Sequence, residues 1–135
     1  MQRWKTAVAA HRARWPLTMH VAESREEIEM FQHARGAMFD WLKKNGRDLG
    51  DCGAGSPVQQ LAALKLLDPR FLAVHVNHLA PGDAARLARS GASVVHCPRS
   101  HAFFRHAPFP FAELHGAGVN LCLGTDSLAS IAPVG

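Results

Sequence analysis

The chain has 135 residues, of which 47% are hydrophobic and 19% are charged, as in an ordinary globular domain. Its net charge of +4 arises from Lys and Arg residues that are scattered among acidic ones, which argues against nucleic-acid binding. No apolar run of about 18 residues appears, and the amino terminus lacks the apolar centre of a secretory signal. We therefore expect a cytoplasmic protein that does not enter a membrane. The three cysteines lie far apart, which predicts free thiols.

The first half of the chain predicts two helices on either side of a short strand. A helix is expected over residues 2–14, and the apolar run over 16–22 predicts a buried strand. A long helix is then expected over 25–46, because Ser24 is a favourable N-cap residue and Gly46 is a favourable terminator.

The second half of the chain alternates helices with strands. A helix that begins at Pro57, after the cap residue Ser56, carries leucines at helical spacing up to residue 68. A strand, a helix, a strand, a short helix and a strand follow, over residues 71–77, 81–91, 92–98, 109–118 and 119–126. Continuous apolar strands separated by helices predict parallel βα units, in an α/β fold whose sheet is covered by helices.

Each of the four predicted strands ends with a side chain that can bind a metal or transfer a proton. These residues are His20, His75, His96 and Asp126. One histidine in an apolar strand is more often a hydrogen-bonded core residue than a ligand, and an aspartate after a strand is a common turn residue. Four such residues at the same end of parallel strands instead favour a functional site, because parallel α/β folds build their sites there.

Four segments of the chain resemble the successive landmarks of a known family. They are "MHVAES", "LAVHVNHL", "ASVVHCPRSH" and "GAGVNLCLGTDSLAS". In order and spacing they are similar to the amidohydrolase superfamily, in its branch of metal-dependent aminohydrolases and chlorohydrolases, which includes adenosylhomocysteine-, aminodeoxyfutalosine- and guanine-type deaminases. The resemblance covers nearly the whole chain from Leu17 onward, and the combination of motifs is specific.

The resemblance implies roles for residues at the ends of three strands. His20 would bind the metal, and Glu23, three residues later, would be the proton shuttle that protonates the leaving amine. His75 would polarise or orient the substrate. Asp126 would bind the metal and accept a proton from the attacking water. On helix-dipole grounds alone, Glu23 would be interpreted as a solvated acid in the first turn of a helix.

The resemblance also implies that the segment after the third predicted strand helps to form the substrate pocket. His96, Arg99, Ser100 and His101 are therefore candidate substrate contacts, and a structural role stays open for each of them. Four phenylalanines follow, for which core packing is preferred over an apolar pocket wall; they are Phe103, Phe104, Phe109 and Phe111.

One landmark of the family has no counterpart in this sequence. The family begins its barrel with an H-x-H pair, whereas no two of the nine histidines here are two positions apart. The resemblance therefore implies that residues 1–135 form one partial catalytic domain, truncated at both ends, with strands five to eight of a (β/α)8 TIM-like barrel. The implied cofactor is a divalent metal ion, with zinc preferred and iron left open, and half of its protein ligands would be missing here.

The implied function is a metal-dependent hydrolase that removes an amino group from an aminated heterocycle, such as a nucleoside, purine, pterin or triazine-like ring. Dechlorination or amide-ring hydrolysis by the same site stays open, and so does a non-catalytic half-barrel module. Besides the small-molecule substrate, the expected partner is a second copy of the chain or the missing half of the barrel. Activity is expected of the parent enzyme and not of the isolated chain.

Overall fold

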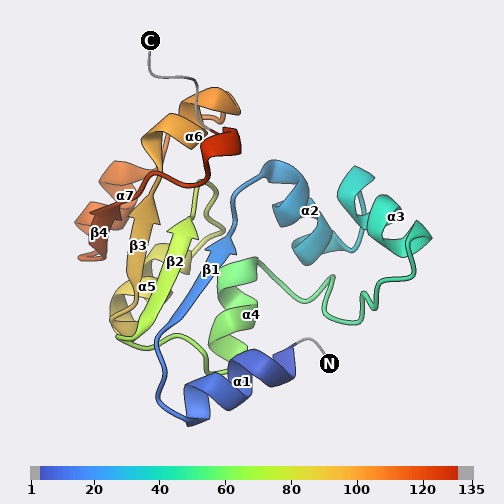
Figure 1. Ribbon diagram of the computed structural model, residues 1–135, viewed down its shortest axis with the longest axis horizontal. Coiled ribbons are helices and arrows are strands. Elements are labelled where there is room, and N and C mark those ends of the chain that lie inside the picture. The colour runs from blue at the N-terminus through green and yellow to red at the C-terminus, as the bar shows by residue number, and fades with distance from the viewer. Residues whose placement is uncertain (1–3, 131–135) are drawn as a thin grey trace.

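The computed structural model describes residues 4–130. Four strands form one parallel sheet in the order β1-β2-β3-β4, so that strands adjacent in the sequence are adjacent in the sheet (Figure 1). The strands are β1 (Leu17–Val21), β2 (Phe71–His75), β3 (Ser93–His96) and β4 (Asn120–Leu123). The predicted fold class, an α/β fold made of parallel βα units, is confirmed.

The helices lie in three groups around the sheet (Figure 1). Four helices pack against one face and enclose the hydrophobic core: α1 (Trp4–Arg12), α4 (Pro57–Ala63), α5 (Asp83–Ser90) and α7 (Phe111–Gly116). Two helices lie to the side of β1: α2 (Arg25–His33) and α3 (Ala37–Lys44). Helix α6 (Pro98–Phe103) and the 3-10 helix η1 (Leu128–Ser130) lie beyond the carboxyl ends of the strands.

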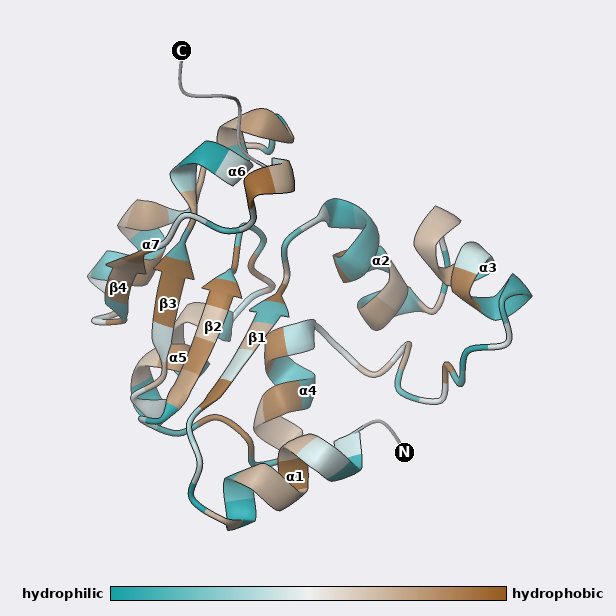
Figure 2. Cartoon of the chain, in the orientation of Figure 1, coloured by the Kyte–Doolittle hydropathy of each residue, from teal (hydrophilic) through white to brown (hydrophobic). Residues whose placement is uncertain are grey.

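The register of the sheet separates a covered face from an open one. One row of aligned residues belongs to the core or packs against it: Met19, Ala73, Val94 and Leu121. The neighbouring row is exposed or half-buried: Thr18, Leu72, Ser93 and Asn120. Strands β2 and β3 are nevertheless largely hydrophobic along their length (brown in Figure 2), which is typical of strands that are buried on both faces.

The prediction of a single helix over 25–46 is wrong, because the structure divides it into α2 and α3. Ala34 has a φ of 50° and Gly36 has a φ of 96°, and neither value belongs to a right-handed helix. The N–H of Gly53 donates to the carbonyl of Phe31 at 2.7 Å, so the Gly-rich loop supplies a hydrogen bond to the last turn of α2. The break thus involves a contact with a distant segment, which local helix signals do not reveal.

Helix α4 begins as predicted and ends earlier than residue 68. Ser56 and Gln59 form a capping box at its start. At its end Lys65 adopts a left-handed φ of 57°, and the N–H of Leu66 donates to the carbonyl of Leu61 at 3.0 Å. This is a Schellman motif, which turns the chain so that Leu66 is buried in the core.

Four further observations complete the comparison with the sequence predictions. Helix α6 was not predicted: Pro98, which was interpreted as the end of a strand, is instead the first residue of this helix. Residues 2 and 3 of the helix predicted over 2–14 lie outside the described residues. All three cysteines are free, as predicted. Within residues 4–130, no helix has the length and apolar character needed to cross a membrane.

Leu87→Ala should destabilise the protein strongly, because the Leu87 side chain is fully buried in the core beneath α5. Removing a buried leucine side chain loses apolar contacts and leaves a cavity, which costs about 2.7–5 kcal/mol of unfolding free energy. Leu123→Ala is the matched control, because Leu123 is 80% exposed and such surface changes usually stay within about 0.5 kcal/mol. Urea unfolding followed by circular dichroism measures both variants, and equal effects would contradict this assignment of the core.

The chain of residues 1–135 should self-associate when it is purified alone. Strands β1 and β4 are the edges of the sheet, and the open face carries exposed apolar side chains such as Leu72. Unpaired strand edges and exposed apolar surface both favour association. Light scattering over a concentration series should therefore report masses above that of the monomer. A monodisperse monomer at every concentration would show that the open face and the strand edges do not cause self-association.

Candidate active site

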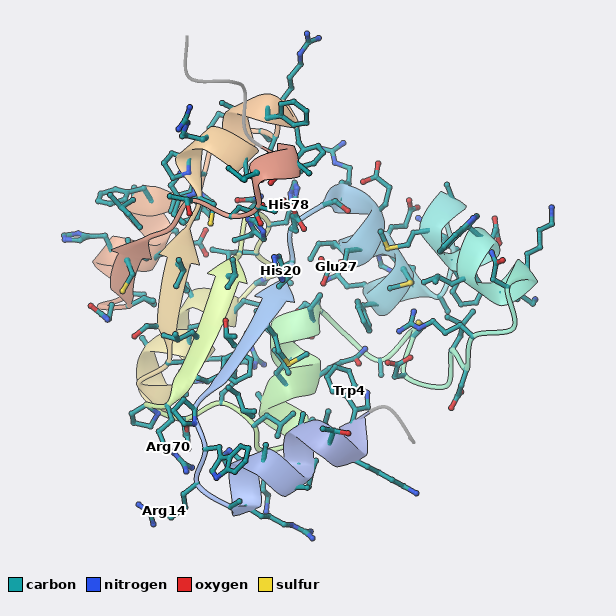
Figure 3. All side chains as sticks on the ribbon, in the orientation of Figure 1. Trp4, Arg14, His20, Glu27, Arg70 and His78 are labelled. Carbon is teal, nitrogen blue, oxygen red and sulfur yellow. The ribbon has the colours of Figure 1, made fainter. Side chains whose placement is uncertain are left out.

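The carboxyl ends of β1 and β2 and the loop after β4 bring together three side chains that could bind a metal ion. They are His20, His75 and Asp126, whose potential ligand atoms all lie within 4.8 Å of one another. Nε2 of His20 is 3.7 Å from Oδ1 of Asp126, and Nε2 of His75 is 3.7 Å from Oδ2 of the same carboxylate. The centroids of the two imidazole rings are 4.9 Å apart. His20 marks this position at the carboxyl end of β1 in Figure 3.

An unusual backbone conformation directs the His75 ring into this group. Alternation along β2 would place His75 on the covered face, with Phe71 and Ala73. His75 instead has a φ of 74°, and Val76 after it has a φ of 51°. Positive φ is rare for residues other than glycine, above all for β-branched ones, and such strain is concentrated at functional sites. We infer that the distortion ends the alternation and turns the His75 ring toward His20.

The "LGTD" segment reaches the site because β4 approaches β3 closely at Gly124. The N–H of Gly124 donates to the carbonyl of His96 at 2.8 Å, which extends the strand pairing beyond β4. A Cβ atom at Gly124 would lie 2.8 Å from Cγ1 of Val95, so a side chain at this position would force a shift. Asp126 then adopts a φ of 61°, a conformation that aspartate tolerates better than most residues. Its side chain is only 13% exposed and belongs to the site, not to a solvated turn.

Polar groups around Asp126 keep its carboxylate ionised. The pKa of Asp126 is lowered to about 2. The Ser100 hydroxyl is the main cause of this shift, the Ser130 hydroxyl and the Ser127 N–H contribute to it, and burial opposes it. The Ser130 hydroxyl donates to Oδ2 at 3.0 Å. Asp126 is therefore charged at neutral pH and able to bind a cation or accept a proton.

The environment of His75 suits a metal or a water molecule. Burial lowers the pKa of His75, against the opposing effect of Glu23, so the imidazole is neutral at pH 7. Its Nε2 atom is buried and has no hydrogen-bond partner in the part of the chain that the structure describes. A neutral imidazole nitrogen next to an ionised carboxylate is a donor set that suits zinc and several other divalent ions. The residues present therefore fit the metal that the motifs imply.

Glu23 lies beside these three side chains. Its Oε1 is 3.5 Å from Nε2 of His75, and its side chain is 30% exposed. The carboxylate is thus in reach of both the buried imidazole and solvent, as a group that carries protons must be. The role of proton shuttle itself stays a prediction.

His96 does not join the other strand-end residues. Its ring stacks on Phe109, with 4.0 Å between the ring centroids, and Phe109 packs against the hydrophobic core. His96 is therefore oriented toward the core and away from the three candidate ligands.

The packing role preferred for the remaining phenylalanines is wrong, because about half of each side chain is exposed: Phe103 49%, Phe104 51% and Phe111 57%.

The other candidate substrate contacts lie on α6. Ser100 is buried, and its hydroxyl helps to lower the pKa of Asp126. Nδ1 of His101 lies 3.1 Å from Oδ1 of Asn77, and Arg99 is on the exposed side of the helix. Contact of these residues with a substrate stays a prediction.

Sequence reasoning missed two residues that contact the backbone of Glu23. Asn77 is 4% exposed and donates to the Glu23 carbonyl, and the Glu27 carboxylate accepts the Glu23 N–H. A buried amide in "HVNH" and an acid three residues after the N-cap Ser24 were the available signals. Both have common structural explanations, so neither stood out.

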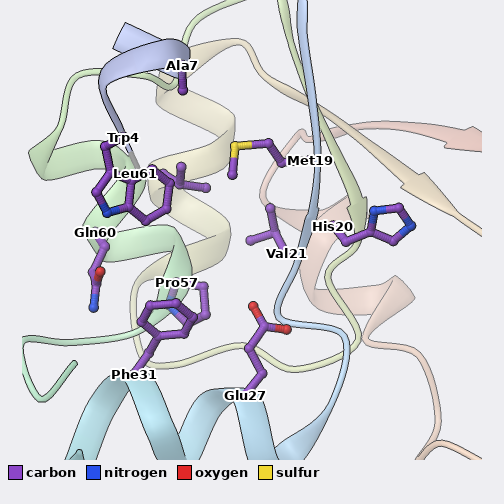
Figure 4. A pocket seen from close by; sticks show the side chains of 10 residues that line it. All are labelled: Trp4, Ala7, Met19, His20, Val21, Glu27, Phe31, Pro57, Gln60 and Leu61. Atoms are coloured by element: carbon purple, nitrogen blue, oxygen red, sulfur yellow. The ribbon is translucent and has the colours of Figure 1, made fainter. Parts of the chain in front are cut away.

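A mainly apolar pocket of about 270 Å³ lies between β1 and helices α1, α2 and α4. Figure 4 shows Met19 and Val21 on the pocket side of β1 and the His20 ring on the opposite side. His20 contributes to the lining of the pocket, but its ring extends to the other side of β1, and neither His75 nor Asp126 lines the pocket.

Comparisons with known proteins agree with this arrangement. The chain matches the model of the "Amidohydrolase family" over residues 3–134. Aminodeoxyfutalosine deaminase from Deinococcus radiodurans is 38% identical, over 85% of this chain and 29% of that protein. A 5-methylthioadenosine/S-adenosylhomocysteine deaminase from Teredinibacter turnerae is 36% identical, over 93% of this chain and 24% of that protein. An adenosine deaminase from Xanthomonas campestris, solved with bound zinc, superposes with a TM-score of 0.67 and 30% identity, over 90% of this chain and 24% of that one. The chain thus spans about a quarter of the length of these proteins.

His20→Ala and Asp126→Asn should each weaken zinc binding by at least about tenfold, because each substitution removes a ligand from the three-residue group. His115→Ala is the control, since His115 is an exposed histidine on α7. Calorimetric titration with zinc in the presence of a competing chelator measures the affinities. Equal affinity in all four proteins would exclude this group as the metal site.

Proposed function

Because this chain belongs to the amidohydrolase family, we propose that it forms part of a metal-dependent hydrolase acting on C–N bonds. The proposed reaction is the hydrolytic removal of an amino group from an aminated heterocycle, with purine nucleosides as the first class to test. Both relatives described above are deaminases by name, which favours deamination over dechlorination or amide-ring hydrolysis. The activity is proposed for the whole protein, of which residues 1–135 would be a partial catalytic domain.

One observation supports this proposal most. Among residues 4–130, the buried Nε2 atom of His75 has no hydrogen-bond partner, and it lies 3.5 Å from Glu23 and 3.7 Å from Asp126. A histidine with a purely structural role would normally have this nitrogen hydrogen-bonded. An unpartnered imidazole nitrogen between two acids instead suits the binding and deprotonation of a small polar molecule such as water.

The proposed mechanism divides the work among four side chains. His20 and Asp126 hold a divalent metal, with zinc preferred and iron left open. When bound, the metal supplies Lewis acidity that makes water nucleophilic at neutral pH. His75 orients the substrate, and Asp126 accepts a proton from the attacking water. Glu23 delivers a proton to the departing amino group, which leaves as ammonia while the ring carbon gains an oxygen.

Further groups are proposed to bind the heterocycle and to complete the site. The segment that carries His96, Arg99, Ser100 and His101 borders Asp126 through Ser100, which supports its role in substrate contact. The open face of the sheet is proposed to be covered by the other half of a barrel or by a second copy of the chain. The other half of a barrel would also supply the H-x-H pair that this chain lacks.

Glu23→Gln in the whole protein should lower ammonia release about 10²- to 10⁴-fold, because glutamine keeps the size of the side chain and cannot transfer the proton. Zinc content should not change. The assay measures ammonia across a panel of aminated purines, nucleosides, pterins and triazines, with metal quantified in each protein. Glu29→Gln is the control, since Glu29 is an acid on the neighbouring helix α2 and pairs with exposed Arg35. Undiminished turnover in Glu23→Gln would remove this residue from the mechanism.

A further inference from the structure

The peptide groups of Ala22 and Glu23 are fully hydrogen-bonded, although both residues lie beyond the end of β1. The Ala22 carbonyl accepts from the N–H of His78 at 3.1 Å, which prolongs the pairing of the strands. The other three groups, two N–H and one carbonyl, are bound by side chains. Because Ala22 is fully buried and has a left-handed φ of 52°, this turn depends on those side chains and not on a regular ladder.

Glu27 binds both N–H groups of the turn. Its Oε1 accepts from Ala22 at 3.0 Å, and its Oε2 accepts from Glu23 at 2.8 Å. Glu27 is three residues after the N-cap Ser24, whose hydroxyl accepts the Glu27 N–H at 3.2 Å. In an ordinary capping box the acid at this position binds the N–H of the cap residue itself. Here the carboxylate reaches one and two residues further back, to the N–H groups of Glu23 and Ala22 (Figures 3 and 4 show Glu27 near the end of β1).

Asn77, in the loop after β2, binds the carbonyl of Glu23. Its Nδ2 donates to the Glu23 carbonyl at 3.0 Å, and its Oδ1 lies 3.1 Å from Nδ1 of His101 on α6. Since the amide oxygen only accepts, His101 must carry its proton on Nδ1 in this contact. The buried Asn77 amide thus connects Glu23 with the helix that carries the candidate substrate contacts.

We propose that Glu27 and Asn77 are positioning residues that clamp the backbone of Glu23 and thereby direct its carboxylate at His75. The functional role of this Glu23 orientation rests on the proposed function, whereas the clamp itself is a structural feature of the chain. A group that transfers protons must be held within a fraction of an ångström of its working position, which a loop residue achieves only through such supporting contacts. Neither Glu27 nor Asn77 touches the reacting atoms in this arrangement.

Hydrogen exchange tests the clamp without reference to activity. In Glu27→Gln one acceptor oxygen is lost, so the Ala22 and Glu23 amides should exchange at least about tenfold faster, as resolved by mass spectrometry with fragmentation. Glu29→Gln, a change of the same kind on the same helix, should leave these amides as they are. Unchanged exchange in Glu27→Gln would overturn the clamp, whether or not the protein is a deaminase.

Turnover tests whether the clamp positions Glu23. Asn77→Asp keeps the shape of the side chain and loses the donor to the Glu23 carbonyl, while its oxygen still accepts from His101. In the whole protein it should lower kcat about 10- to 100-fold with little change in KM, the usual effect of losing a supporting contact. The loss should disappear in a Glu23→Gln background, because the group being positioned is then already inactive. Asn45→Ala is the control, since Asn45 also donates to a backbone carbonyl but lies on the exposed end of α3.

The two parts of the experiment separate the possible failures. A kcat loss that persists undiminished in the Glu23→Gln background would overturn positioning and leave Asn77 a general structural role. A wild-type protein that releases no ammonia from any member of the panel would overturn the proposed function. The hydrogen-exchange rates would still show whether the clamp exists. Circular dichroism of each variant confirms that the fold is retained before either comparison is made.

Discussion

The parallel alignment of strand ends is the constraint on which the candidate site depends. Val21 and His75, the last residues of β1 and β2, are paired across the sheet, so both strands end at the same level. Gly124 continues the pairing of β4 with the carbonyl of His96, which brings the segment of Asp126 to that level as well. Because side chains alternate along a strand, a slip of one residue in the pairing of β1 would move the His20 ring to the covered face.

Three carboxylates share this small region, and their environments give them different tasks. The Glu27 carboxylate accepts two backbone N–H groups, and burial is the main cause of its raised pKa. Asp126 is surrounded by hydroxyl groups that lower its pKa. Glu23 is more exposed and points at His75. Glu27 therefore binds backbone N–H groups, whereas the carboxylates of Asp126 and Glu23 lie beside a neutral imidazole. A divalent cation would offset their negative charge.

The covered and open faces of the sheet explain why the site is accessible from one side only. The helices that pack on the covered face close the core and place the apolar pocket behind β1. On the open face, apolar residues of β2 such as Leu72 remain in contact with solvent. A sheet with apolar residues on both faces is most stable when both are covered, so the composition of β2 and β3 favours an additional layer over this face.

The amino-acid sequence by itself determined the order of the four strands, the fold class and the family, because apolar periodicity, caps and the spacing of four motifs are local properties of the chain. It also named four strand-end residues, of which His20, His75 and Asp126 meet, since parallel strands place their carboxyl ends together. Tertiary structure decided the rest. Contacts with distant segments accompany the break between α2 and α3 and the orientation of His96 toward Phe109, and a left-handed turn at the end of β2 directs the His75 ring. The clamp on Glu23 was equally hidden, because one of its two side chains comes from a residue 54 positions further along the chain, and such a contact exists only once the sheet has formed.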